Sequence, residues 1–210
     1  MEDWMLFATY MFDSIRQPKD DIRFNENTIW EITEVPDCEP IRVVFSRKHW
    51  FSLFRCQRQN TVYNISKINR NSELSSIMKQ NGVLDFCRRV VKQNKDAGHF
   101  LNGIVFDLYI VDGNAYIESL IYSYKGACRN IPQKELRALV NSIRPHGKTN
   151  MKKAIDIANA IYFKNEFDLC EFIKKVFAQK SAYSDKGISR ICICDVSCTK
   201  KTYVNNNFKM

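Results

Sequence analysis

The spacing of apolar residues along the chain changes repeatedly between the two-residue period of a strand and the 3.6-residue period of a helix. Alternating or short apolar runs predict strands in four places: residues 27–35, 41–46, 190–195 and 201–208. Pro36 and Pro40 place a loop between the first two of these strands. Pairing of such short strands with helices between them indicates an α+β protein.

Apolar residues that recur every three or four positions predict amphipathic helices over residues 2–16, 48–58, 73–80, 83–94, 132–143 and 166–180. Pro132 occupies the first turn of its helix, where a missing backbone N–H does no harm. Residues 150–163 follow a break around Pro145 and Gly147, and their apolar positions also lie three residues apart.

Residues 103–124 form the most distinctive pattern, two β-rich runs on either side of Asp112-Gly113. This dipeptide favours a type I′ turn, which joins the two strands of a hairpin. With Asp112 and Gly113 as the loop, Val111 pairs with Asn114. Counting outward, we expect Asp107 to lie directly opposite Glu118.

Facing carboxylates need an explanation, because side chains paired across strands have Cβ atoms only about 4.5–5.5 Å apart and like charges there repel. Water can separate the charges, one group can take up a proton, or a cation can lie between them. Mg²⁺ and Mn²⁺ prefer oxygen ligands. The third option therefore predicts a Mg²⁺ or Mn²⁺ site, while a solvent-facing pair remains the alternative.

The composition fits a globular protein inside a cell. The chain has 210 residues, of which 45% are hydrophobic, and this suits one domain or two small ones. The acidic start, the absence of a long apolar run and eight irregularly spaced cysteines predict no secretion, no membrane insertion and reduced thiols. We therefore expect a location in the nucleus or cytoplasm.

The basic residues exceed the acidic ones by enough to favour a nucleic-acid partner. Lys and Arg number 32 against 23 Asp and Glu, which gives a net charge of +9. Such an excess attracts nucleic acid through counterion release. The candidate contacts are the clustered basic residues Arg88, Arg89, Lys92, Lys152 and Lys153. Ordinary solvated helix faces would give the same pattern.

The hairpin sequence resembles that of a known family. Asp107-Leu108-Tyr109, followed by Asn114 and by Ile117-Glu118, is similar to the metal-binding hairpin of the endonuclease domain at the N-terminus of the orthomyxovirus polymerase acidic subunit. That domain belongs to the PD-(D/E)XK nucleases. The resemblance implies a mixed β-sheet flanked by helices, in one endonuclease-like domain over residues 1–210. It also implies RNA and other viral polymerase subunits as partners.

The same resemblance implies roles for individual residues. The metal ligands would be Asp107, Glu118, the carbonyl of Ser119, His49 and Asp85, and the catalytic lysine would be Lys134 or Lys125. Three departures weaken the match: Phe106 stands where the family has proline, Lys79 stands where it has an acidic ligand, and the histidine expected near residue 40 has His49 as its nearest candidate.

Together these features predict a metal-dependent RNA endonuclease of the cap-snatching type, or a degenerate relative that has lost cleavage. The alternative is a basic viral or intracellular protein without enzymatic activity that binds nucleic acid or a protein partner.

Overall fold

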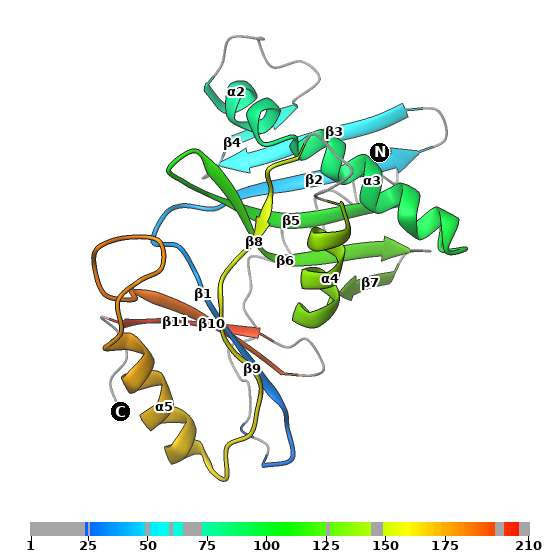
Figure 1. Cartoon of the computed structure of the whole chain (residues 1–210). Helices are drawn as coiled ribbons and strands as arrows, with labels where there is room; N and C mark the ends of the chain where they lie inside the picture. The colour runs from blue at the N-terminus through cyan, green and yellow to red at the C-terminus, as the bar shows by residue number, and fades with distance from the viewer. Residues whose placement is uncertain are drawn as a thin grey trace. The chain divides into compact units, whose positions relative to one another are not determined.

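The computed structural model describes residues 24, 26–48, 51–58, 61–64, 73–124, 127–143, 149–195 and 200–205. The helix predicted over residues 2–16 lies outside these ranges, as do the candidate site residues His49 and Lys125. The described residues fold into two compact units, one within Cys38–Lys153 and the other combining segments within Ile15–Asp37 and Ala154–Met210 (Figure 1). Each unit has its own sheet and its own core.

The first unit is built on a seven-stranded sheet. Its strands are β2 (Ile41–Lys48), β3 (Phe51–Arg58), β4 (Thr61–Asn64), β5 (Gly103–Val111), β6 (Asn114–Tyr124), β7 (Ala127–Asn130) and β8 (Lys152–Lys153). They are antiparallel in the order β4-β3-β2-β5-β6-β7, and β8 pairs in parallel with β6. The helix predicted over residues 48–58 is wrong, because β3 pairs along β2 from Phe51 opposite Lys48 to Gln57 opposite Arg42.

Three helices belong to this unit: α2 (Glu73–Gln80), α3 (Val83–Asp96) and α4 (Gln133–Ile143). Figure 1 shows α3 and α4 lying across one face of the sheet. Alternate residues of the strands point to that face. There Phe106 of β5 meets Phe86 of α3 edge to face, with ring centroids 5.8 Å apart. The other residues of β5, including Asp107 and Tyr109, therefore point to the opposite face.

The described residues of the second unit form a four-stranded sheet and one helix. Its strands are β1 (Trp30–Glu34), β9 (Asp156–Ile161), β10 (Arg190–Asp195) and β11 (Lys200–Val204), in the antiparallel order β11-β10-β1-β9. Helix α5 (Glu166–Phe177) begins at Asn165, whose side chain accepts a hydrogen bond from the backbone N–H of Asp168. Its apolar face, including Ile173 and Val176, packs on Trp30 and Ile32 of the central strand.

Strand β9 is irregular, and its pairing with β1 shifts register twice. Ala160 in this strand has a left-handed backbone with φ 57°. A Cβ makes this conformation costly, whereas glycine adopts it freely. We expect Ala160→Gly to raise the free energy of unfolding by about 0.5–1 kcal/mol, despite the greater freedom of glycine in the unfolded chain.

Chemical denaturation followed by circular dichroism tests this expectation. Ala158→Gly is the matched control, since Ala158 lies in the same strand and its backbone is not left-handed. Glycine there should destabilise the protein by about 1 kcal/mol. Equal destabilisation by both substitutions would contradict the assignment of strain to Ala160.

The α+β class predicted from sequence is confirmed, since both units combine sheets with helices. No helix in the described ranges is long and apolar enough to cross a membrane. Five cysteines within these ranges are free thiols: Cys38, Cys87, Cys170, Cys192 and Cys194. Burial raises the pKa of the Cys87 thiol, so this side chain stays protonated and serves as core packing.

Candidate functional site

The turn between β5 and β6 has the predicted conformation. Asp112 and Gly113 both have positive φ, 49° and 76°, as a type I′ turn requires. The four pairs next to the turn, from Val111 with Asn114 to Leu108 with Ile117, have the predicted register. Beyond them the register shifts, and Phe106 pairs with Leu120. β6 therefore has one more residue than β5 over this stretch, a β-bulge beside Asp107.

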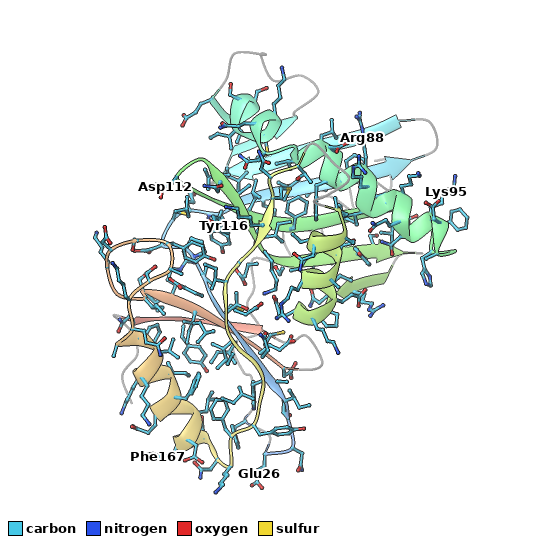
Figure 2. All side chains as sticks on the ribbon, viewed as in Figure 1. Glu26, Arg88, Lys95, Asp112, Tyr116 and Phe167 are labelled. Atoms are coloured by element: carbon cyan, nitrogen blue, oxygen red, sulfur yellow. The ribbon has the colours of Figure 1, made fainter. Side chains whose placement is uncertain are left out.

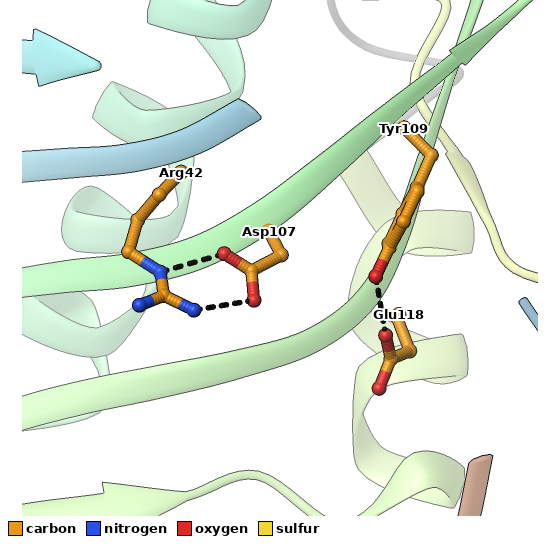
Figure 3. A network of polar contacts seen from close by, with 4 residues as sticks. All are labelled: Arg42, Asp107, Tyr109 and Glu118. Carbon is orange, nitrogen blue, oxygen red and sulfur yellow. Dashed lines mark hydrogen bonds and ion pairs between the residues drawn. The ribbon is translucent and has the colours of Figure 1, made fainter. Parts of the chain in front are cut away.

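Asp107 is held by an arginine on the neighbouring strand. Arg42 of β2 lies opposite Asp107 in the sheet, and its Nε and Nη2 donate to the two carboxylate oxygens at 2.7 and 2.8 Å (Figure 3). Both side chains are largely buried, with 17% and 11% of their surfaces exposed. This two-point geometry is the strongest ion pair that an arginine forms. The Asp107 charge is thus balanced within the sheet.

Glu118 is held by different groups. Its Oε2 accepts a hydrogen bond of 2.9 Å from the Tyr109 hydroxyl, and its backbone oxygen accepts one of 2.9 Å from Gln133 at the start of α4. The residue is 2% exposed. Figure 3 shows Asp107 turned toward Arg42 and Glu118 turned toward Tyr109. The two carboxylates are therefore parts of one polar network on this face of the sheet, each with its own partner.

Asp107 was predicted to face Glu118 alone, but the bulge sets both Glu118 and Ser119 opposite Asp107. In the part of the chain that the structure describes, no three His, Cys, Asp or Glu side chains gather where they could hold a metal ion. Asp85 instead pairs with Arg89 on the same helix, at 3.0 Å. Ser119 lies half-buried in β6.

The lysine predicted for catalysis does not reach this network through any contact in the structure. Lys134 is exposed in the first turn of α4. The α4 side chain that contacts the hairpin is its neighbour Gln133. The other candidate, Lys125, lies outside the described residues.

Asn81 connects the turn to the rest of the unit through hydrogen bonds. No motif or spacing in the sequence predicted this role. Its Oδ1 accepts from the Ala115 N–H at 3.0 Å, and its Nδ2 donates to the carbonyls of Gly113 and Ile77 at 3.1 Å. Its own carbonyl accepts from the Thr149 hydroxyl and the Asn150 N–H. One buried amide thus joins the hairpin turn to the segment that leads into β8.

The five predicted nucleic-acid contacts lie in two places in the first unit. Arg88, Arg89 and Lys92 lie on α3, and Arg89 is paired with Asp85. Lys152 and Lys153 form β8. The Lys152 ammonium donates to Asn114 Oδ1 at 3.1 Å and lies 5.6 Å from the ring centroid of Tyr116.

Among the described residues of the second unit, one carboxylate is buried. Glu34, at the end of β1, is 3% exposed. Its two oxygens accept hydrogen bonds from the Ser181 hydroxyl and the Ala182 N–H. These bonds hold the loop after α5 against the end of β1, so Glu34 has a structural role in this unit.

The architecture has counterparts of known structure. Two largely antiparallel sheets, the first with α3 and α4 on one face, make up this α+β architecture. Mutants of Naegleria gruberi RNA ligase solved with AMP and Mn, with ATP and Mn, and without ligand have TM-scores of 0.59, 0.62 and 0.62 to this chain. They are 10% identical to it.

The likeness extends over 87–88% of this chain, so it includes both units. The chain spans about half the length of these ligases, 51–52%. No protein-family model and no curated protein sequence matches the chain. At this identity the comparison establishes the fold.

The comparison corrects the family predicted from the hairpin. The neighbours are RNA ligases, so the assignment to the PD-(D/E)XK endonuclease of a viral polymerase subunit is wrong, and so is the prediction of cap-snatching cleavage. A short β-hairpin with a type I′ turn occurs in many folds, and its sequence carries no information about the strands around it. The ligand roles of Asp107, Glu118, Ser119, Asp85 and His49 rested on that resemblance.

Proposed function

We propose that this chain is an RNA ligase-type protein that binds an adenine nucleotide and acts on RNA ends. The observation that carries the proposal is the likeness to ligases solved with ATP or AMP, which extends over both units. The net charge of +9 favours an RNA partner, because basic side chains that bind phosphates release counterions. The free thiols fit a protein that works inside a cell.

We propose that Mn²⁺ binds together with the nucleotide. The described residues present no three-ligand set for a resident ion. Cations of this kind are often held by the phosphates of the substrate plus one or two carboxylates, and Asp107 and Glu118 are the hairpin carboxylates that we propose for the role. The ion would neutralise phosphate charge.

Transfer of an adenylyl group through a covalent intermediate requires a nucleophile, and a partly desolvated lysine amine is one suitable group. Among the lysines whose side chains the structure describes, Lys152 and Lys153 are half-buried, and the rest are exposed. We therefore propose Lys152 or Lys153 as the group to test first.

The experiment incubates the purified chain with ATP labelled at the α-phosphate and MnCl₂, and measures label retained on denatured protein. We expect labelling that is lost in Lys152→Ala/Lys153→Ala. The matched control is Lys174→Ala/Lys175→Ala on α5, which removes the same charge from an exposed face. A thermal shift with ATP, with and without Mn²⁺, reports binding separately.

A second function, RNA binding without catalysis, is favoured by one specific observation. The Lys152 amine contacts Asn114 and the Tyr116 ring, and Asp107 is balanced by Arg42. Binding of RNA without any label on the protein would favour this second function. Neither stabilisation nor label would overturn the nucleotide part of the proposal.

A further inference from the structure

One outer face of α3 carries a row of basic side chains. Arg88, Lys92 and Lys95 are all exposed, and their spacing of four and three residues places them on one side of the helix. We call these three residues the α3 stripe. The opposite side of the helix, including Phe86 and Val90, is buried in the core. Figure 2 labels Arg88 and Lys95, which lie along the helix toward its C-terminal end.

The acidic residues of α3 do not cancel this charge. Asp85 accepts a hydrogen bond from Arg89 at 3.0 Å. The charge of Asp85 is therefore balanced by Arg89, which is not part of the α3 stripe. Asp96 is exposed beside the last turn. Four basic residues against two acidic ones leave the helix with a net charge of +2.

The end of α3 sets the path of the chain toward an exposed aromatic residue, Phe100, which lies five positions after Lys95 in the sequence. Gly98 has φ +83°, its N–H donates to the Lys95 carbonyl at 2.9 Å, and the His99 N–H donates to the Asn94 carbonyl at 2.7 Å. These two bonds define a Schellman motif, which sets the direction of the chain as it leaves the helix.

Phe100 follows this motif directly and precedes Leu101, which is buried in the core. The backbone of Phe100 is thus held on both sides, yet its side chain is 64% exposed. An exposed ring on a fixed backbone costs little entropy when it binds a partner.

We propose that the α3 stripe and Phe100 together bind single-stranded RNA, an inference that rests on the proposed function. The α3 stripe spans about 10 Å along the helix axis, enough to contact more than one phosphate. The Phe100 ring offers a stacking surface for an unpaired base. Bases of a duplex are stacked on each other, so the ring selects a single strand.

The other exposed aromatic residues of the described chain lie in a less suitable setting. Tyr162 and Phe167, 61% and 62% exposed, are near the start of α5. The first turn of that helix carries Glu166 and Asp168, whose charges repel phosphate. Phe167 is therefore a matched control for Phe100.

The test measures binding of a fluorescent 20-nucleotide single-stranded RNA by anisotropy at several salt concentrations. Replacing all three residues of the α3 stripe by glutamine should reduce the slope of log K against log salt by about 2, since each phosphate contact contributes about 0.7. Affinity at low salt should fall on the order of tenfold or more. Phe100→Ala should weaken binding on the order of tenfold with the slope unchanged.

Two control variants remove the same number of charges, or an equally exposed ring, from another part of the chain. They show whether weaker binding depends on the position of the lost group. Lys164→Gln/Lys174→Gln/Lys175→Gln removes three exposed positive charges from the second unit. Phe167→Ala removes an equally exposed ring. Both controls should bind RNA much more tightly than the matching α3 variants.

Equal losses in the α3 variants and their controls would overturn this inference while leaving RNA binding, and hence the proposed function, in place. RNA binding through the α3 stripe without any response to ATP would support the inference and remove the nucleotide part of the proposed function. A wild-type chain that binds no single-stranded RNA would overturn the inference and the RNA part of the proposed function together.

Discussion

Asn81→Ala should lower the free energy of unfolding of the first unit by about 2–4 kcal/mol. Asn81 is 2% exposed, and its side chain satisfies the buried N–H of Ala115 and the carbonyl of Gly113. Alanine would leave the buried Ala115 N–H without a partner, which costs about 1–3 kcal/mol, and would remove the hydrogen bond to the Gly113 carbonyl, which contributes about 1 kcal/mol. Urea denaturation followed by circular dichroism measures the loss.

Hydrogen exchange shows which part of the chain loses stability in Asn81→Ala. The amide of Ala115 should exchange faster in the variant, because Asn81 accepts its hydrogen bond. Asn150→Ala is the matched control, since this amide is exposed and its side-chain contact with the Gln80 carbonyl is long, at 3.5 Å. A loss below about 0.5 kcal/mol for Asn81→Ala, equal to a surface change, would show that the turn does not depend on Asn81.

Arg42→Met should destabilise the first unit by about 2–4 kcal/mol, a second large effect. Methionine keeps most of the side-chain volume but removes both hydrogen bonds to Asp107, whose carboxylate would then be a largely buried charge without its cation. Unfolding in urea gives the magnitude. Arg89→Met is the control, because the Arg89–Asp85 pair is much more exposed and should contribute less than about 1 kcal/mol.

A double-mutant cycle isolates the pair itself. Arg42→Met/Asp107→Leu removes both charges, so it should be more stable than the sum of the single changes predicts. Additive effects, or equal losses for Arg42→Met and Arg89→Met, would mean that the pair does not hold β2 to β5.

Elements defined by local chemistry were predictable from the sequence. The Asp112-Gly113 turn and the four pairs beside it follow from the backbone preferences of two residues. Helices α3 and α5 also follow from the spacing of their own apolar residues. Such elements need no information from distant parts of the chain.

Features that depend on distant partners were missed. Residues 51–58 carry aromatic residues at helical spacing, but β2 offers an antiparallel partner and the segment becomes β3. In β9, two register shifts give the threefold spacing of Ala158 and Ile161 within a strand. Tertiary pairing outweighs such weak local preferences.

The partners of the hairpin residues were missed for the same reason. Arg42 reaches Asp107 across 65 positions of sequence, and Asn81 reaches Ala115 across 34. The bulge that displaces Glu118 leaves no trace in composition. A match confined to one hairpin therefore gave carboxylates without their partners, and gave the wrong family.

The order in which the chain visits its two units has a consequence for folding. β1 and β9 are neighbours in one sheet, yet the Cys38–Lys153 segment of the first unit lies between them in sequence. The Glu34 N–H donates to the Ile155 carbonyl at 2.8 Å, so the outgoing and returning segments are in contact. Closing such a long loop in an unfolded chain is entropically costly and slow. We therefore expect the second unit to fold after the first, because a folded first unit shortens the flexible loop that must be closed to pair β1 with β9.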